Sequence, residues 1–173
     1  MGVLYRVRQF WQVWRPEPWT VTESQAVSAV LSPAEQALFN RFNDSDRWHG
    51  WRVWQMLLAA GHTHPDLQVA ALLHDVGKTR VSLRVWERVL IVLAEAVWPG
   101  ASAVLGQGEP RGWKRPFVVR AQHARWGAEM AANAGSRPLA VALIRRHQDP
   151  LPETAESEED RLLALLQWAD NQN

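Results

Sequence analysis

The stretch Val69-Ala-Ala-Leu-Leu-His-Asp-Val-Gly-Lys78 combines an apolar helical segment with two adjacent side chains that can bind metals, His74 and Asp75. Successive residues of an α-helix lie about 100° apart around its axis, so an imidazole and a carboxylate there can approach one ion from two directions. Alternatively, the carboxylate can bridge two ions. Burial of either group without a partner is costly in free energy. The rest of the sequence is therefore expected to supply their partners.

Length and composition are typical of one folded domain. The chain has 173 residues, of which 47% are hydrophobic and 21% charged, and its net charge is +1. These values exclude a disordered chain and give no general case for nucleic-acid binding. We expect a single domain over residues 1–173, in which N-terminal helices within residues 1–43 pack on a core formed by residues 44–170.

Cysteine is absent, which excludes disulfides, thiolate catalysis and cysteine-ligated zinc. Histidine and carboxylate side chains remain as the strong metal ligands. The N-terminal residues 1–14 contain no signal-peptide pattern. The most apolar later run, residues 89–97, contains Glu95 and is shorter than the about 20 residues of a transmembrane helix. We therefore expect no transmembrane segment, a cytoplasmic location, and a buried helix at residues 89–97.

The spacing of apolar residues and of helix-ending residues predicts an all-α fold. Apolar residues recur at intervals of three and four, and glycine, proline and capping residues fall at helix-sized intervals. Ser32-Pro-Ala-Glu35 and Asn43-Asp-Ser-Asp46 are typical helix starts. Gly77 is expected to end the helix that carries the dyad. The Gly-, Pro- and Arg-rich segment 100–116 is expected to be irregular and is a candidate lid. The predicted helices cover residues 4–14, a segment from 22 or 24 onward, a segment from 33 onward, and residues 47–60, 65–75, 83–98, 117–134, 138–147 and 157–170.

Five predicted helices each carry a metal-competent side chain on an apolar face, as judged from the neighbours at three, four and seven positions. A single such histidine is usually a satisfied core residue. Five helices with this property favour one shared polar centre, and imidazoles with carboxylates suit a divalent transition metal. The residues concerned are His49, His74, His123, His147 and Asp170.

The ordered set His49, His74-Asp75, His123, His147 and Asp170 resembles the HD-domain superfamily of metal-dependent phosphohydrolases over residues 44–170. The resemblance implies a single-domain helical bundle of the HD type, with its metal site in the core. It implies that His49, His74, Asp75 and Asp170 hold one metal ion. His123 and His147 correspond to the extra histidines of the binuclear branch, in which Asp75 would bridge two ions.

Two positions depart from the pattern of the binuclear HD phosphodiesterases. Gln148 stands where many of them have a second histidine directly after the one that matches His147. The Gly-Tyr-Pro element of the HD-GYP group is also missing, because His147 is followed by Gln-Asp-Pro-Leu-Pro. The chain is therefore not assigned to the HD-GYP group, and the expected content is one or two divalent ions.

The resemblance implies an enzyme in which metal-activated water hydrolyses a nucleotide or another small phosphoester, as a monoesterase or a diesterase. The metal would be Mn, Fe, Co, Ni or Zn, and Mg is possible. Asp75 and Lys78 are the candidate catalytic residues, and Lys78 could contact a phosphate oxygen. Two alternatives stay open: a mixed-valent di-iron oxygenase that uses the same six ligands, and a non-catalytic scaffold that binds metal or nucleotide.

Further basic residues are candidates for substrate binding, although solvated surface charges are the simpler interpretation. Most of the 11 tryptophans are expected in the core. Trp113 lies among basic residues and could stack on a nucleobase. The helix at residues 4–14 could lie on a membrane surface, but packing on the domain is favoured. The candidate basic residues besides Lys78 are Arg111, Lys114, Arg115 and Arg146.

Overall fold

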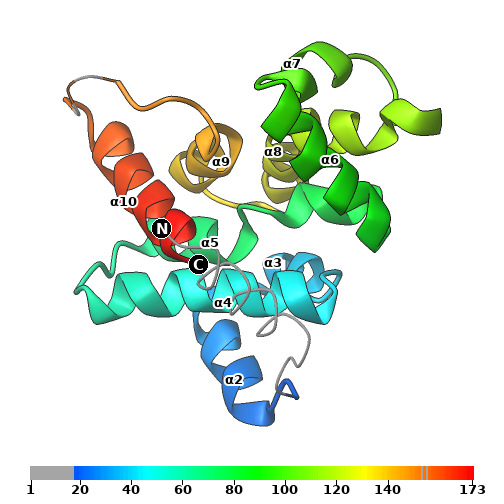
Figure 1. The fold of residues 1–173 in the computed structure, drawn as a ribbon. Helices are drawn as coiled ribbons and strands as arrows, with labels where there is room; N and C mark the ends of the chain where they lie inside the picture. Colours follow the sequence, from blue (N-terminus) through cyan, green and yellow to red (C-terminus); the bar gives the residue numbers. More distant parts are fainter. Residues whose placement is uncertain (1–17, 153, 155) are drawn as a thin grey trace.

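The computed structural model describes residues 18–152, 154 and 156–173, and within them it contains helices and no strands, which confirms the all-α prediction. The helix expected at residues 4–14 lies outside the described part of the chain. The helices, shown in Figure 1, are α2 (Val21–Val30), α3 (Pro33–Phe39), α4 (Asp44–Ala59), α5 (Pro65–Leu73), the 3₁₀ helix η1 (Val76–Arg80), α6 (Val85–Val97), α7 (Ala101–Leu105), the 3₁₀ helix η2 (Gly112–Lys114), α8 (Arg115–Asn133), α9 (Pro138–Arg146) and α10 (Glu158–Gln172).

The helix starts follow the capping signals of the sequence. Ser32 caps α3 through a capping box with Glu35, and Asn43 caps α4 through the backbone N–H of Asp46. The second helix starts earlier than predicted, because Thr20 forms a capping box with Glu23 and α2 begins at Val21. Side-chain oxygens at these caps satisfy backbone N–H groups that have no partner inside the helix.

Helix α5 lies at the centre of the bundle (Figure 1), and all of its apolar side chains after Pro65 are buried. It packs against α4, α9 and α10, which surround it. Its apolar residues fill its whole circumference, which is typical of a helix buried on all sides. His74 and Asp75, which follow α5 in the chain, are thereby placed in the interior although both are polar.

The dyad sits at the junction between α5 and η1. His74 is the last residue in helical geometry after Leu73, and Asp75 precedes η1. The prediction that Gly77 ends the helix is wrong, since Gly77 lies inside η1. A Cβ atom at Gly77 would lie 1.9 Å from the backbone oxygen of His123 and 2.6 Å from the backbone nitrogen of Gly127. The glycine therefore permits close contact between η1 and α8.

Two other predictions are corrected by the structure. Segment 100–116 is not an irregular loop, because it contains α7 and η2. The Glu95 carboxylate accepts hydrogen bonds from the backbone N–H groups of Gly100 and Ser102 at the start of α7. The apolar run at residues 89–97 is not buried: Val92 is 65% and Val97 88% exposed on α6. No described helix is long and apolar enough to cross a membrane.

The tryptophans divide between the core and the surface. Trp54 and Trp126 are buried, and Trp48 and Trp51 are half-buried. Trp86, Trp98 and Trp113 are exposed, although most tryptophans are expected in the core. These three lie in the segment from α6 to η2, whereas Trp168, which is 42% exposed, lies on α10.

The contact between η1 and α8 gives a test of the fold. Gly77→Ala is expected to lower the free energy of unfolding by about 1–3 kcal/mol or more, because the new methyl group must displace the α8 backbone. Urea unfolding followed by circular dichroism measures this change. Gly61→Asn is the control: Gly61 has φ +84°, has open space around its Cβ position, and tolerates asparagine. Equal stability of Gly77→Ala and the wild-type protein would contradict the proposed close packing.

Candidate metal centre

Six predicted ligands converge from different elements of the bundle. His49 comes from α4, His123 from α8 and Asp170 from α10, whereas His74, Asp75 and His147 lie just after the ends of α5 and α9. Their ligand atoms form two groups, within each of which the atoms lie no more than 4.8 Å apart. The first group is His49, His74 and Asp170, and the second is Asp75, His123 and His147.

In the first group, three atoms that carry lone pairs lie close together. Nε2 of His49 lies 2.8 Å from Oδ1 of Asp170, and Nε2 of His74 lies 3.6 Å from the same oxygen. The two Nε2 atoms are 3.2 Å apart. Two ring nitrogens and a carboxylate oxygen can share this small volume only if a proton or a cation lies between them.

The second group is more deeply buried. Nε2 of His123 lies 3.3 Å and Nε2 of His147 lies 3.7 Å from Oδ1 of Asp75. Both Nε2 atoms are buried, and neither has a hydrogen-bond partner in the described part of the chain. A buried polar atom without a partner costs free energy, so a ligand of these nitrogens is expected.

Asp75 connects the two groups. Its Oδ1 faces His123 and His147, whereas its Oδ2 lies 3.6 Å from Nε2 of His74 and 3.9 Å from Nε2 of His49. One carboxylate therefore presents one oxygen to each group. This is the arrangement that a carboxylate needs in order to bridge two ions.

The backbone sets which ring nitrogen faces the centre. A neutral imidazole that donates its Nδ1–H keeps a lone pair on Nε2, which is the form that binds a metal. In three of the histidines, Nδ1 lies within hydrogen-bond distance of a backbone carbonyl oxygen of the preceding helical turn. Nδ1 of His74, His123 and His147 lies 3.0, 3.0 and 2.8 Å from the carbonyl oxygen of Ala71, Val119 and Ile144, respectively.

The charges of the centre suit cation binding. Burial lowers the pKa of His147 to about 3, so its ring is neutral. Burial alone would raise the pKa of Asp75, but Lys78 and the neighbouring histidines hold it well below the usual range. Asp170 also has a lowered pKa, because hydrogen bonds from His49 and His74 outweigh its burial. Ionised carboxylates with a neutral imidazole are the donor states that divalent metals require.

His74 shows the opposite shift. Burial lowers its pKa, but the carboxylates of Asp75 and Asp170 outweigh the burial, so the net pKa is raised. A buried histidine that attracts a proton indicates an excess of negative charge around it. A metal ion in the first group would neutralise the same charge.

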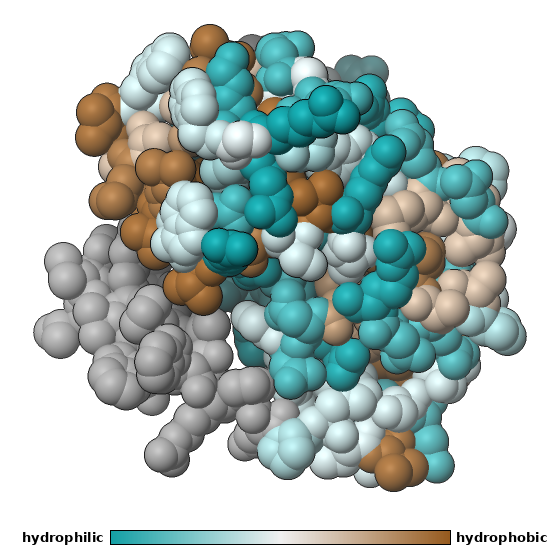
Figure 2. Space-filling model, turned by 90° about the vertical axis from the view of Figure 1, so that its right-hand side faces the viewer, coloured by the Kyte–Doolittle hydropathy of each residue, from teal (hydrophilic) through white to brown (hydrophobic). Residues whose placement is uncertain are grey.

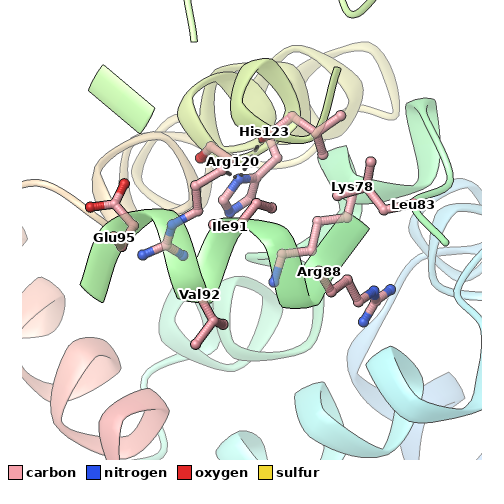
Figure 3. A pocket seen from close by; sticks show the side chains of 9 residues that line it. Lys78, Leu83, Arg88, Ile91, Val92, Glu95, Arg120 and His123 are labelled. Carbon is pink, nitrogen blue, oxygen red and sulfur yellow. Dashed lines mark hydrogen bonds between the residues drawn. The ribbon is translucent and has the colours of Figure 1, made fainter. Parts of the chain in front are cut away.

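A cavity of about 390 Å³ opens beside the second group (Figure 3). His123 and Lys78 form part of its wall, and the Lys78 ammonium donates a hydrogen bond to Oδ2 of Asp75. The cavity lies between η1, α6 and α8. Its lining residues are Lys78, Leu83, Arg88, Ile91, Val92, Glu95, Val119, Arg120 and His123.

The other basic residues predicted to bind substrate do not line this cavity. Arg111 pairs with Glu109 at 2.9 Å on the surface, and the Lys114 ammonium lies 5.7 Å from the Trp113 ring centre. The remaining two make ion pairs in their own surroundings: Arg115 with Glu87 at 3.2 Å, and Arg146 with Asp160 at 3.0 Å.

Two arginines that the sequence analysis did not single out line the cavity instead. Arg120 lies three residues before His123 on α8, a spacing that places both on one side of a helix and that could have identified it. Arg88 has no comparable sequence signal. Its position depends on the path of α6, which follows η1 and lies along the cavity beside the second ligand group.

Comparison with known families agrees with this geometry. The HD domain family matches residues 49–171 of the chain. The chain belongs to the HD domain family. The match begins at His49 and ends one residue after Asp170, so it includes all six converging side chains. HD domains bind divalent metals, and their superfamily is one of metal-dependent phosphohydrolases. No curated protein and no solved structure matches the chain.

Gln148, the position at which the HD sequence departs from binuclear phosphodiesterases, is exposed on the surface. The second group reaches three ligand residues without it. The geometry therefore gives no reason to restrict this HD domain to one ion.

We predict that the protein loaded with Mn²⁺ holds two ions per chain. Asp170→Asn should remove one of them, because only the first group loses its carboxylate. Asp75→Asn should remove both, because a neutral amide replaces the charged carboxylate that the two groups share. Metal analysis of the desalted proteins gives the counts. A single ion in the wild-type protein, or equal losses in the two variants, would be incompatible with a bridging Asp75.

Proposed function

We propose that this HD domain is a metal-dependent phosphohydrolase that cleaves small phosphoesters at a two-ion centre. The observation that carries the proposal is the placement of Asp75, which offers one oxygen to each of two groups of ligands. The buried and unpartnered Nε2 atoms of His123 and His147 support it, because they face this carboxylate.

The donor set suits divalent transition metals. Imidazole nitrogens and carboxylate oxygens bind Mn²⁺, Fe²⁺, Co²⁺, Ni²⁺ and Zn²⁺, and the order of affinities gives no preference for one of them in the cell. When bound, such ions would lower the pKa of water toward about 7 and polarise a phosphoryl oxygen. The backbone carbonyl groups that hold the Nδ1 atoms keep the imidazoles aligned for this role.

Side chains of the cavity would bind the phosphoester. Lys78 lies between Asp75 and the open cavity, so its ammonium can donate hydrogen bonds to a non-bridging phosphoryl oxygen. Arg88 and Arg120 add two positive charges to the lining, and Glu95 adds one negative charge. The excess of positive charge attracts anionic ligands, and a phosphoester is such a ligand.

The direct test is a metal and substrate panel. Protein prepared without metal is loaded separately with Mn²⁺, Fe²⁺, Co²⁺, Ni²⁺ and Mg²⁺ and is assayed on phosphomonoesters, phosphodiesters and nucleoside triphosphates. Phosphate or alcohol release that depends on the metal supports the proposal and distinguishes a monoesterase from a diesterase. Oxygen uptake by the iron-loaded protein, without hydrolysis, would instead favour an oxygenase.

Lys78 gives a separate prediction. Lys78→Ala should reduce kcat/KM by about ten- to a hundredfold, because a hydrogen bond to a charged group contributes about 1.5–3 kcal/mol. The metal content should stay at the wild-type value, since Lys78 supplies no metal ligand. Lys114→Ala, at an exposed lysine outside the cavity, should leave both quantities unchanged. Loss of metal from Lys78→Ala would show that the lysine supports the centre rather than the substrate.

A further inference from the structure

The cavity beside His123 is lined by cationic side chains, by aliphatic side chains and by the carboxylate of Glu95. Lys78 and Arg120 extend into it on either side of the His123 ring (Figure 3). The aliphatic side chains of Leu83, Ile91 and Val92 line the same cavity, and Leu83 lies next to Lys78. The anionic head of a ligand would thus lie over His123, and the rest of the ligand would meet hydrocarbon.

The cations of this cavity differ in their existing partners. Arg88 is held by two hydrogen bonds, of 3.1 and 3.2 Å, to the carboxylate of Asp46. The guanidinium of Arg120 forms no hydrogen bond or ion pair with any described residue, although it interacts electrostatically with Glu95. Glu95 itself is occupied by the backbone of α7. Arg120 is therefore available to an anionic ligand, together with Lys78.

Among the described residues, the lining contains no aromatic side chain, outside the candidate metal ligand His123, on which a nucleobase could stack. Proteins hold bases by stacking on aromatic rings and by hydrogen bonds to the base edges. Apart from His123, which belongs to the metal ligands, no aromatic side chain is present among the described lining residues, and neither is any amide or hydroxyl side chain. The exposed Trp113, a candidate for base stacking, lies outside the cavity. The leaving group is better matched by an aliphatic chain.

The aliphatic wall continues onto the surface of the molecule. Val92 lines the cavity and is also 65% exposed. It belongs to a stripe along α6 that is spaced at three and four residues and so lies on one side of the helix. The exposed members of this α6 stripe are Val85, Trp86, Val89, Val92, Leu93 and Val97, of which all but Trp86 are aliphatic. Figure 2 views the molecule from the side on which α6 lies and shows hydrophobic side chains gathered along one edge of a mostly hydrophilic face.

We propose that the substrate is a phosphoester of an aliphatic alcohol. The phosphate lies over His123 between Lys78 and Arg120, and the alkyl chain runs past Leu83, Ile91 and Val92 toward the α6 stripe. Hydrolysis forms a bond from phosphorus to the oxygen of water, breaks the bond to the alcohol oxygen, and transfers one proton from the water to that oxygen. This inference rests on the proposed phosphohydrolase function and specifies its substrate class.

A series of alkyl phosphates tests the inference. Ethyl, butyl and hexyl phosphate and adenosine 5′-monophosphate are assayed for phosphate release by the metal-loaded protein, below the concentrations at which micelles form. We expect kcat/KM to rise by about fourfold for each added methylene, which corresponds to about 0.8 kcal/mol of burial. Hexyl phosphate should exceed the nucleotide.

Val92→Asp provides the matched variant, because Val92 is 65% exposed and a carboxylate there stays in contact with water. It should reduce kcat/KM for hexyl phosphate at least tenfold more than for ethyl phosphate. Val104→Asp, at an exposed valine on α7 outside the cavity, should leave the preference for hexyl phosphate intact. Thermal unfolding by circular dichroism establishes that both variants are folded.

The outcomes separate the two proposals. Hydrolysis that does not depend on chain length, or faster hydrolysis of the nucleotide, would overturn the aliphatic substrate while leaving the phosphohydrolase function in place. Absence of phosphate release from every ester by protein that holds two ions would overturn both. An equal effect of Val92→Asp on ethyl and hexyl phosphate would also overturn the path proposed for the chain.

Discussion

The rest of this structure depends on the ionised Asp75 carboxylate in the core. Asp75 is only 4% exposed. Its pKa is held well below the usual range, although burial by itself would raise the pKa. A buried charge is tolerated only with partners that compensate for the loss of water. Histidines from α4, α8 and the ends of α5 and α9 surround it, and Lys78 contacts it from η1. The helices of the bundle thus surround a buried, ionised carboxylate together with the groups that compensate its charge.

Much of this arrangement could be predicted from the sequence, because helical periodicity reports which side of a helix is apolar. The periodicity around His49, His74, His123, His147 and Asp170 predicted that each faces the interior, and the structure brings all of them together with Asp75. The all-α fold and the HD family are confirmed. The metal binding of the six residues and the roles of the cavity residues stay predictions.

The parts that could not be predicted depend on tertiary contacts. An apolar stripe such as that of α6 does not show whether another element covers it, so burial was predicted where Val92 and Val97 are exposed. The local signals predict a helix stop at Gly77, because they do not show the approach of the α8 backbone. The sequence also does not show which groups a long basic side chain contacts. Arg115 and Arg146 form ion pairs with acidic side chains, whereas Arg88 and Arg120 line the cavity.

The two ligand groups differ in their access to solvent. The side chains of His49 and Asp170 are 22% and 29% exposed, whereas those of His123 and His147 are 0% and 2% exposed. An ion in the first group could leave past these partly exposed side chains, whereas an ion in the second could leave through the cavity that Lys78 and His123 line. The two positions would therefore exchange metal by different routes. A phosphoester bound in the cavity would close the second route and leave the first open, so that it would slow the loss of one ion and not of the other.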